Sequence, residues 1–304
     1  MHKPVLLAEV IANLNIKDKG IYVDATFGRG GHSREILKLL GPNGQLLVLD
    51  KDPQAIQEAK LIEDKRVKVH HGSFKNLKKW IAELGLLGKI DGILLDLGVS
   101  SPQLDEPQRG FSFMQDGPLD MRMDPSQSYD AAAWINTASE KEIDNVLQEY
   151  GEEKFHRRIA AAIVRAREIA PIKRTLQLAA IIAKANPKWE RHKHPATRSF
   201  QAIRIFINHE LEELKNCLEQ SLEILTVKGR LLIITFHSLE MRIVKQFLHK
   251  YAKADFLPRD IPIKYQELKI RLQKIKGTIR PNKDEIVINP RARSAALTVM
   301  EKIS

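Results

Sequence analysis

The chain has 304 residues, 43% hydrophobic and 29% charged, with a formal net charge of +11. This is ordinary for a globular protein built as one large α/β domain, or as one domain that carries a smaller insertion. No apolar run reaches the roughly 18 residues that a membrane span needs, and Cys217, a lone cysteine, excludes an internal disulfide. The start of the sequence lacks the pattern of a signal peptide, so we expect a cytoplasmic location and no membrane partner.

The first hundred residues alternate between short apolar strands and amphipathic helices. Strands are predicted at 21–24, 45–50, 67–70 and 90–97, and helices at 34–40 (capped by Ser33), 53–62 and 76–84. The stretch at 90–97 contains the apolar run Ile93-Leu94-Leu95, as in a strand buried on both faces. The alternation therefore predicts an α/β fold with a doubly wound, mostly parallel sheet of the Rossmann-like kind.

Between Pro102 and Arg204 the strand pattern stops. Helices are predicted near 139–149, 152–169 and 176–185. After them a long helix from Phe200 to Leu225 is predicted, then a strand at 230–236, a helix at 241–249 and a last strand at 294–301. We therefore expect an inserted helical domain at 103–204, within a sheet domain made of 1–102 and 205–304.

Positive charge is concentrated in two stretches of the sequence. Residues 152–208 carry a net charge of +9 and residues 250–304 carry +7, whereas residues 1–104 carry only +3. Clusters of this kind favour a nucleic-acid partner over a merely solvated face. The basic residues expected to form the RNA surface of the insertion are Lys154, Arg158, Arg165, Arg191, Lys193, Arg198 and Arg204.

A glycine loop follows the first predicted strand. Gly28, Gly30 and Gly31 allow a sharp turn and a close approach of backbone to ligand. Asp50 ends the second strand, 20 residues after Gly30, where a carboxylate can accept both ribose hydroxyls of an adenosine. The combination indicates a nucleoside cofactor bound at the carboxyl edge of the sheet.

Asp24 and Ser33 distinguish between two such cofactors. A dinucleotide enzyme prefers Gly or Ala where Ser33 stands, and a carboxylate beside the loop, Asp24, would repel a pyrophosphate. The same carboxylate suits the sulfonium and amino group of S-adenosyl-L-methionine, which we favour over NAD. The alternative is that Asp24 only caps the loop.

Two further positions lie after predicted strands. Phe74 could pack against adenine or belong to the core, and the sequence does not separate the two. Asp96 ends the fourth strand and precedes a tight polar loop, which is more typical of a site than of a fold feature.

The sequence contains long motif blocks that resemble the bacterial family that methylates N4 of a cytidine in the decoding region of 16S ribosomal RNA. The blocks cover 24–33, 91–105, 109–113, 117–124, 194–202, 236–240 and 289–294, while 250–288 is not diagnostic. The resemblance implies a class I methyltransferase that acts on 16S rRNA within the small ribosomal subunit or its precursor. It also implies that S-adenosylmethionine contacts Gly30, Gly31, His32, Asp50, Phe74, Asp96 and Gln103, of which His32 and Gln103 follow from the resemblance alone.

The chemistry also favours a nitrogen or oxygen nucleophile over carbon 5 of cytosine. Carbon 5 needs a thiolate nucleophile, but Cys217 lies on the apolar face of its helix, as a core residue would. Candidate acceptors for the N4 hydrogens are Asp96, the hydroxyl of Ser100 or Ser101 and the backbone carbonyls of the 97–102 loop. His237 follows the fifth strand as a second catalytic candidate, although a structural histidine is as good an interpretation.

Several alternatives stay open. A ribose 2′-O-methyltransferase would need a lysine near Asp96, and only Lys89 is near that motif. A nicotinamide-dependent oxidoreductase and a non-catalytic RNA-binding module are the other two. Phe111 or Phe113 could stack on a target base or lie in the core. The histidines lack metal-ligand spacing, so no metal is expected, and the oligomeric state is not fixed, a homodimer being allowed.

Overall fold

The computed structural model describes residues 4–188, 194–252 and 271–304, and it divides into two compact units. One unit consists of Met1–Gly98 with Leu211–Ser304, and the other is Val99–Glu210. The sequence placed the insertion at 103–204. Two of the basic residues expected to contact RNA, Arg191 and Lys193, lie outside the described residues.

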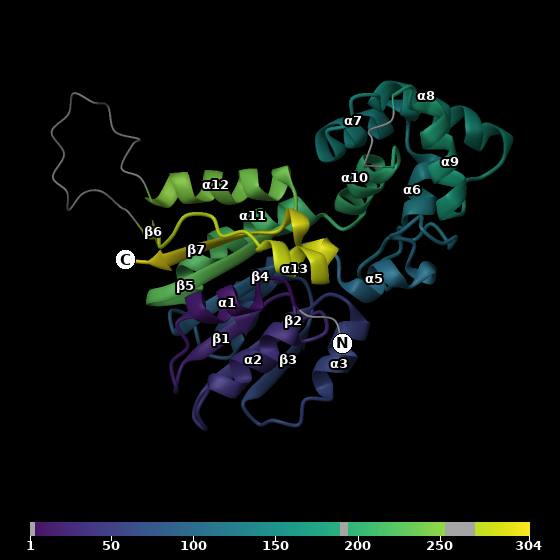
Figure 1. Cartoon of the computed structure of the whole chain (residues 1–304). Coiled ribbons are helices and arrows are strands. Elements are labelled where there is room, and N and C mark those ends of the chain that lie inside the picture. Colours follow the sequence, from purple (N-terminus) through teal and green to yellow (C-terminus); the bar gives the residue numbers. More distant parts are fainter. Residues whose placement is uncertain (1–3, 189–193, 253–270) are drawn as a thin grey trace, which may run out of the picture. The chain divides into compact units, whose positions relative to one another are not determined.

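The first unit is built on a seven-stranded sheet (Figure 1). Its strands are β1 (Ile21–Asp24), β2 (Gln45–Asp50), β3 (Val67–His71), β4 (Ile90–Asp96), β5 (Leu225–Thr235), β6 (Leu272–Lys274) and β7 (Ala296–Lys302). The order is β3-β2-β1-β4-β5-β7-β6, with β1 to β5 parallel and β7 antiparallel to both of its neighbours. The predicted doubly wound, mostly parallel sheet is confirmed, and the ends of β1, β2 and β4 lie at one edge.

Helices cover both faces of this sheet. On one face, α4 (Leu77–Glu83), α11 (Glu210–Ile224) and α12 (Ser238–Ala252) share a buried core with strand residues such as Leu47 and Ile93. On the other, α1 (Leu7–Leu14), α2 (Gly31–Leu39) and α3 (Pro53–Lys60) pack on the alternate residues, such as Leu46 and Leu94. Consecutive apolar residues that point to alternate faces are what a sheet covered on both sides requires.

The second unit is helical and has its own core. Its helices are α5 (Ser101–Asp105), α6 (Ala131–Thr137), α7 (Glu140–Gly151), α8 (His156–Ile169), α9 (Thr175–Ala185) and α10 (Thr197–Ile207). Phe111 is buried in this core, and Phe113 packs edge-on against Phe200 with ring centroids 4.7 Å apart. These contacts favour the core interpretation of both aromatics over base stacking.

The single helix predicted from Phe200 to Leu225 is wrong. The chain forms two helices, because α10 ends at Ile207 and His209 has a left-handed φ of 52°. The buried Asn208 accounts for the break, since its side chain accepts a hydrogen bond from Met123 N (2.7 Å) and donates one to the carbonyl of Met121 (2.7 Å). A polar side chain that satisfies buried backbone groups of another segment fixes the chain at that point.

Other elements also depart from the prediction. Helix α2 begins at Gly31 with Gly30 as its N-cap, so Ser33 lies in the first turn and is not the cap. Helices α1, α5 and α6, strand β6 and the short helix α13 (Lys283–Ile288) were not predicted from the sequence. In the part of the chain that the structure describes, no helix is long and apolar enough to cross a bilayer.

Candidate cofactor site

The glycine loop between β1 and α2 is shaped by its close packing. Gly30 has a left-handed φ of 69°, and a Cβ there would lie 2.4 Å from the ring of Phe27. A Cβ on Gly31 would lie 2.2 Å from Pro4 Cγ. Both positions therefore require glycine, and the loop can expose backbone at the edge of the sheet.

Asp24 holds this loop in place through hydrogen bonds. Its carboxylate accepts a hydrogen bond from Ser33 Oγ (2.6 Å) and one from Thr26 N (3.2 Å), and the residue is fully buried. Burial raises the pKa of Asp24 to about 6, against these two hydrogen bonds, which lower it. Asp24 therefore does what the alternative interpretation expected, while still placing a buried acid at the site.

Asp50 connects the loop to the end of β2. Its two carboxylate oxygens accept hydrogen bonds from Gly28 N (2.8 Å) and Asp52 N (2.9 Å). Burial raises the pKa of Asp50 to about 6 despite these bonds. Each oxygen keeps a second lone pair, so the carboxylate can still accept from a ribose hydroxyl.

The buried His32 and the partly buried Asp96 lie side by side next to the loop. His32 Nε2 lies 3.6 Å from Asp96 Oδ2, too far for a hydrogen bond. Burial raises the pKa of Asp96 to about 8, helped by the charges of Asp24 and Glu240, and lowers the pKa of His32 to about 4. Within the described residues, Asp96 Oδ1 and both ring nitrogens of His32 are buried without a hydrogen-bond partner. Native proteins rarely leave such atoms unsatisfied, so the pair points to a ligand.

His237 and Glu240 cap the N-terminus of α12. Glu240 Oε2 accepts hydrogen bonds from Phe236 N (2.7 Å) and His237 N (3.3 Å), and His237 Nδ1 accepts one from Glu240 N (3.4 Å). His237 Nε2 lies 3.2 Å from Glu240 Oε1. The pair works as a helix cap, so the structural interpretation of His237 has direct support, while its catalytic role stays a prediction.

The remaining expected residues are less constrained by the structure. Phe74 is half-buried against the core beneath α4, consistent with either of its two interpretations. Ser100 and Gln103 belong to the helical unit, where the side-chain oxygen of Gln103 accepts a hydrogen bond from Ser100 N (2.9 Å) and caps α5. Their predicted contacts with substrate and cofactor stay predictions.

The site as a whole selects for positive charge. Asp24 and Glu240, which are buried, and Asp50 and Asp96, which are partly buried, bring four carboxyl groups to one edge of the sheet, with His32 held neutral. A pyrophosphate would be repelled here, whereas a ligand with a sulfonium and an ammonium group would relieve the repulsion among the acids. Within the described part of the chain, no group of three or more His, Cys, Asp or Glu is placed to hold a metal ion.

A family model, described as the MraW methylase family, matches residues 1–303. The chain belongs to the MraW methylase family. A relative from Coxiella burnetii (strain CbuG_Q212), named ribosomal RNA small subunit methyltransferase H, is 57% identical over 100% of this chain and 99% of its own. One from Legionella pneumophila (strain Corby), with the same name, is 55% identical with the same coverage. A solved SAM-dependent O-methyltransferase from Thermotoga maritima aligns with 100% of this chain and 68% of its own at 11% identity and a TM-score of 0.42, which is too weak to bear on function.

Membership of the MraW methylase family confirms the enzyme class predicted from the sequence, a methyltransferase that uses S-adenosylmethionine. The strand order, with β7 inserted antiparallel beside β5, is that of class I methyltransferases. The sequence analysis missed Thr26, whose hydroxyl accepts a hydrogen bond from Asp96 N (2.7 Å), and Glu240. The spacing of Glu240, three residues after His237, is a capping-box signal that could have revealed it.

We predict that Asp50→Ala weakens S-adenosylmethionine binding by about 1.5–3 kcal/mol, because it removes charge-assisted hydrogen bonds to the ribose. Isothermal titration calorimetry measures this directly. Glu58→Ala is the matched control, since Glu58 is an acid on the next helix that pairs with Arg29 at the surface. Equal affinities for the wild type and Asp50→Ala would mean that the ribose is held elsewhere.

Asp96 predicts a pH dependence of stability in the cofactor-free protein. Its folded-state pKa, about 8, lies above the value near 3.9 of an unfolded aspartate, so the folded state retains a proton that the unfolded state releases. The free energy of unfolding should therefore fall as pH rises from about 4 to about 8. Asp96→Asn cannot ionise, and its Tm advantage over the wild type should grow by a few degrees across that window.

Thermal melts at pH 5 and pH 8 test this, with Glu63→Gln as a control because Glu63 is an exposed acid. The same Asp96→Asn protein should bind S-adenosylmethionine more weakly than the wild type. A Tm difference that does not change with pH would contradict the prediction.

Proposed function

We propose that this methyltransferase transfers a methyl group from S-adenosylmethionine to the exocyclic N4 of a cytidine in the decoding region of 16S rRNA. The substrate is the small ribosomal subunit or its precursor, in the cytoplasm, with a monomer or a homodimer as the acting form. The observation that carries the proposal is the acidic edge at Asp24, Asp50 and Asp96, whose pKa values are all raised, in a chain 57% identical end to end to a protein named ribosomal RNA small subunit methyltransferase H.

The bound S-adenosylmethionine supplies an electrophilic methyl group on a sulfonium. Asp96 is our candidate in the sheet unit to act on the amino group of the base, because its Oδ1, like Nε2 of His237, is buried without a hydrogen-bond partner among the described residues. A hydrogen-bond acceptor at this position localises the lone pair of N4 and holds it in line with the methyl group to be transferred. It can also take the released proton, consistent with the raised pKa of Asp96. The hydroxyl of Ser100 stays a second predicted contact.

The test is methyl transfer to small subunits from a strain that lacks the gene. Tritiated methyl donor, followed by nucleoside mass analysis, should give N4-methylcytidine and no 5-methylcytidine. A methylated ribose would favour the 2′-O alternative. Absence of transfer with intact RNA binding would favour the non-catalytic module.

The environment of Cys217 argues independently against carbon 5. The thiol is completely buried in the core beneath the sheet, and burial, helped by Glu213, raises the pKa of Cys217 to about 12. A thiolate nucleophile is therefore not available at neutral pH. Cys217→Ala should keep the wild-type kcat, with at most a modest loss of Tm from the missing packing. Loss of turnover in a folded Cys217→Ala protein would reopen the carbon-5 mechanism.

The helical unit is our candidate for the main RNA surface. Arg158 and Arg165 are exposed on α8, with Ile159 and Ile163 of the same helix buried in the core. Phosphate contacts by such residues give affinity and salt dependence. Changing Arg158, Arg165 and Arg198 together to Glu should weaken RNA binding and lower the slope of log K against log salt by about 2, taking about 0.7 per contact on single strands.

Filter binding across a salt series measures this effect, and calorimetry should show unchanged cofactor binding. A triple charge reversal at Lys60, Lys65 and Lys79, all exposed on the sheet unit, controls for net charge. If both triple variants keep the wild-type salt slope, the basic face of the insertion is only solvated.

A further inference from the structure

Helix α12 starts at the cofactor site and leads away from it. His237 and Glu240 cap its first turn, directly after β5. From Ser238 to Lys250 the helix extends about 18 Å at 1.5 Å per residue. Anything bound along this helix would therefore be continuous with the edge of the sheet where the methyl group is transferred.

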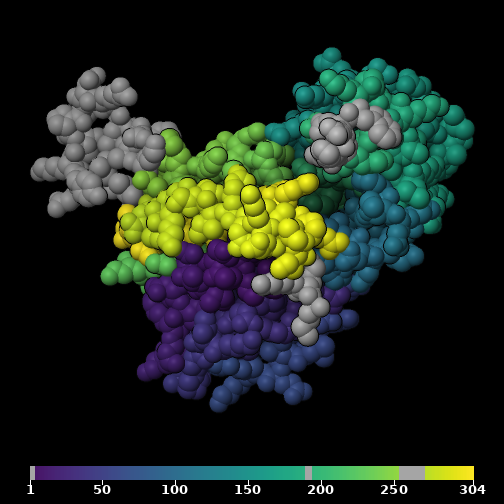
Figure 2. All heavy atoms as spheres, viewed as in Figure 1, coloured from purple at the N-terminus to yellow at the C-terminus, as the bar shows by residue number. Residues whose placement is uncertain are grey.

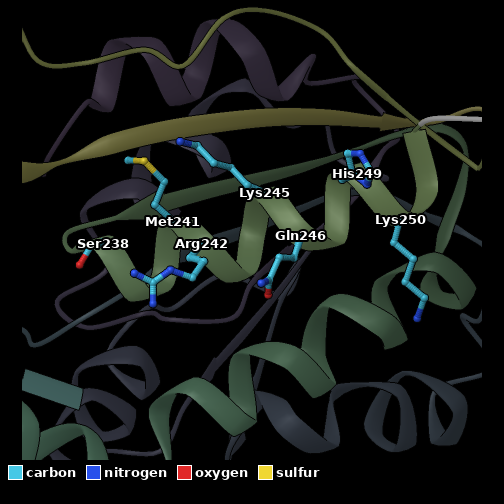
Figure 3. A pocket seen from close by; sticks show the side chains of 7 residues that line it. All are labelled: Ser238, Met241, Arg242, Lys245, Gln246, His249 and Lys250. Atoms are coloured by element: carbon cyan, nitrogen blue, oxygen red, sulfur yellow. The ribbon is translucent and has the colours of Figure 1, made fainter. Parts of the chain in front are cut away.

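The helix has one buried and one exposed face. Leu239, Ile243, Val244 and Phe247 face the protein interior. The opposite face lines a surface pocket made by Ser238, Met241, Arg242, Lys245, Gln246, His249 and Lys250 (Figure 3). The spacing of three and four residues places all seven on one side of the helix.

The exposed face is positive and carries no acid. Arg242, Lys245 and Lys250 lie on it, whereas Glu240, the helix's single carboxylate, is buried at the site. The side chains of Arg242 and Lys245 diverge from this face in Figure 3, so the pocket has a cation at two of its margins. Lys250 pairs with Glu219 of α11 (2.9 Å), and Lys245 forms no ion pair with any residue that the structure describes.

The C-terminal segment, whose strands β6 and β7 pack against α12, is also rich in positive charge. Residues 271–304 carry eight Lys and Arg against three Asp and Glu. This segment lies beside α12 in the sheet unit, as Figures 1 and 2 both show. Its exposed cations are Lys274, Lys276, Arg280, Lys283, Arg291 and Arg293.

We propose that the exposed face of α12 binds the phosphates of the RNA strand next to the target nucleotide. This rests on the proposed function and adds to it a contact surface on the sheet unit itself. A pocket edged with cations and lacking acids matches a polyanion, and its partly buried Met241 is the only large apolar side chain among the lining residues. The contact supplies affinity and register for the strand, not sequence choice.

The experiment compares R242E/K245E with the charge-matched control K19E/K65E. Lys19 and Lys65 are exposed and precede β1 and β3, at the edge of the sheet opposite the site. Small subunits from a strain lacking the gene serve as the RNA probe. In R242E/K245E we expect KM for the subunits to rise by tenfold or more, the salt slope of binding to fall by about 1.4 for two lost contacts, and the cofactor Kd to stay at the wild-type value.

The outcomes separate the two proposals. If the wild type methylates no RNA, the proposed function fails, whatever the variants do. If the wild type is active and R242E/K245E keeps its KM and salt slope, the RNA contact on α12 is wrong. Equal losses in both double variants would also overturn it, because they would reflect net charge. A larger cofactor Kd or a lower Tm in R242E/K245E would assign α12 a structural role instead, and R242Q/K245Q then checks the phosphate contact without reversed charge.

Discussion

The loop after β1 depends on hydrogen bonds to both strands that flank β1. Thr26 accepts a hydrogen bond from Asp96 N at the end of β4, and Gly28 donates one to the carboxylate of Asp50 at the end of β2. Asp24 adds a bond to Ser33 in the first turn of α2. Because β1 pairs with both β2 and β4, these bonds fix the ends of three strands and the start of α2 relative to one another. These bonds therefore attach the candidate cofactor site directly to the central strands of the sheet.

This arrangement gives the site its charge and reduces the stability of the empty protein. Burial raises the pKa values of Asp24, Asp50 and Asp96, so keeping these groups ionised opposes folding. A bound cation reverses that balance, since it is attracted to the groups that repel one another. The ionised acids thus lower the stability of the empty protein but raise its affinity for a positively charged ligand. They also discriminate against a dinucleotide.

The sequence predicted what local patterns determine. Strand ends at Asp24, Asp50 and Asp96 could be read from apolar runs followed by acids, and the structure has strands ending at all three positions. The break at Asn208 could not be predicted, because it depends on hydrogen bonds to Met121 and Met123, some 85 residues earlier in the chain. The bond from Ser33 to Asp24 is also tertiary, and a serine before an amphipathic run resembles an N-cap when only its neighbours in sequence are considered.

The burial of Cys217 has a consequence for how this enzyme can be studied. An enzyme that attacks a base through a thiolate can be captured on RNA containing a modified pyrimidine, because the covalent adduct then cannot resolve. Here the Cys217 sulfur is buried between α11 and the sheet, and the thiol keeps its proton at any physiological pH. Crosslinking of that kind therefore has no thiol to attach to on this protein. Alkylating reagents that inactivate thiol-dependent methylases should likewise leave its folded form unmodified.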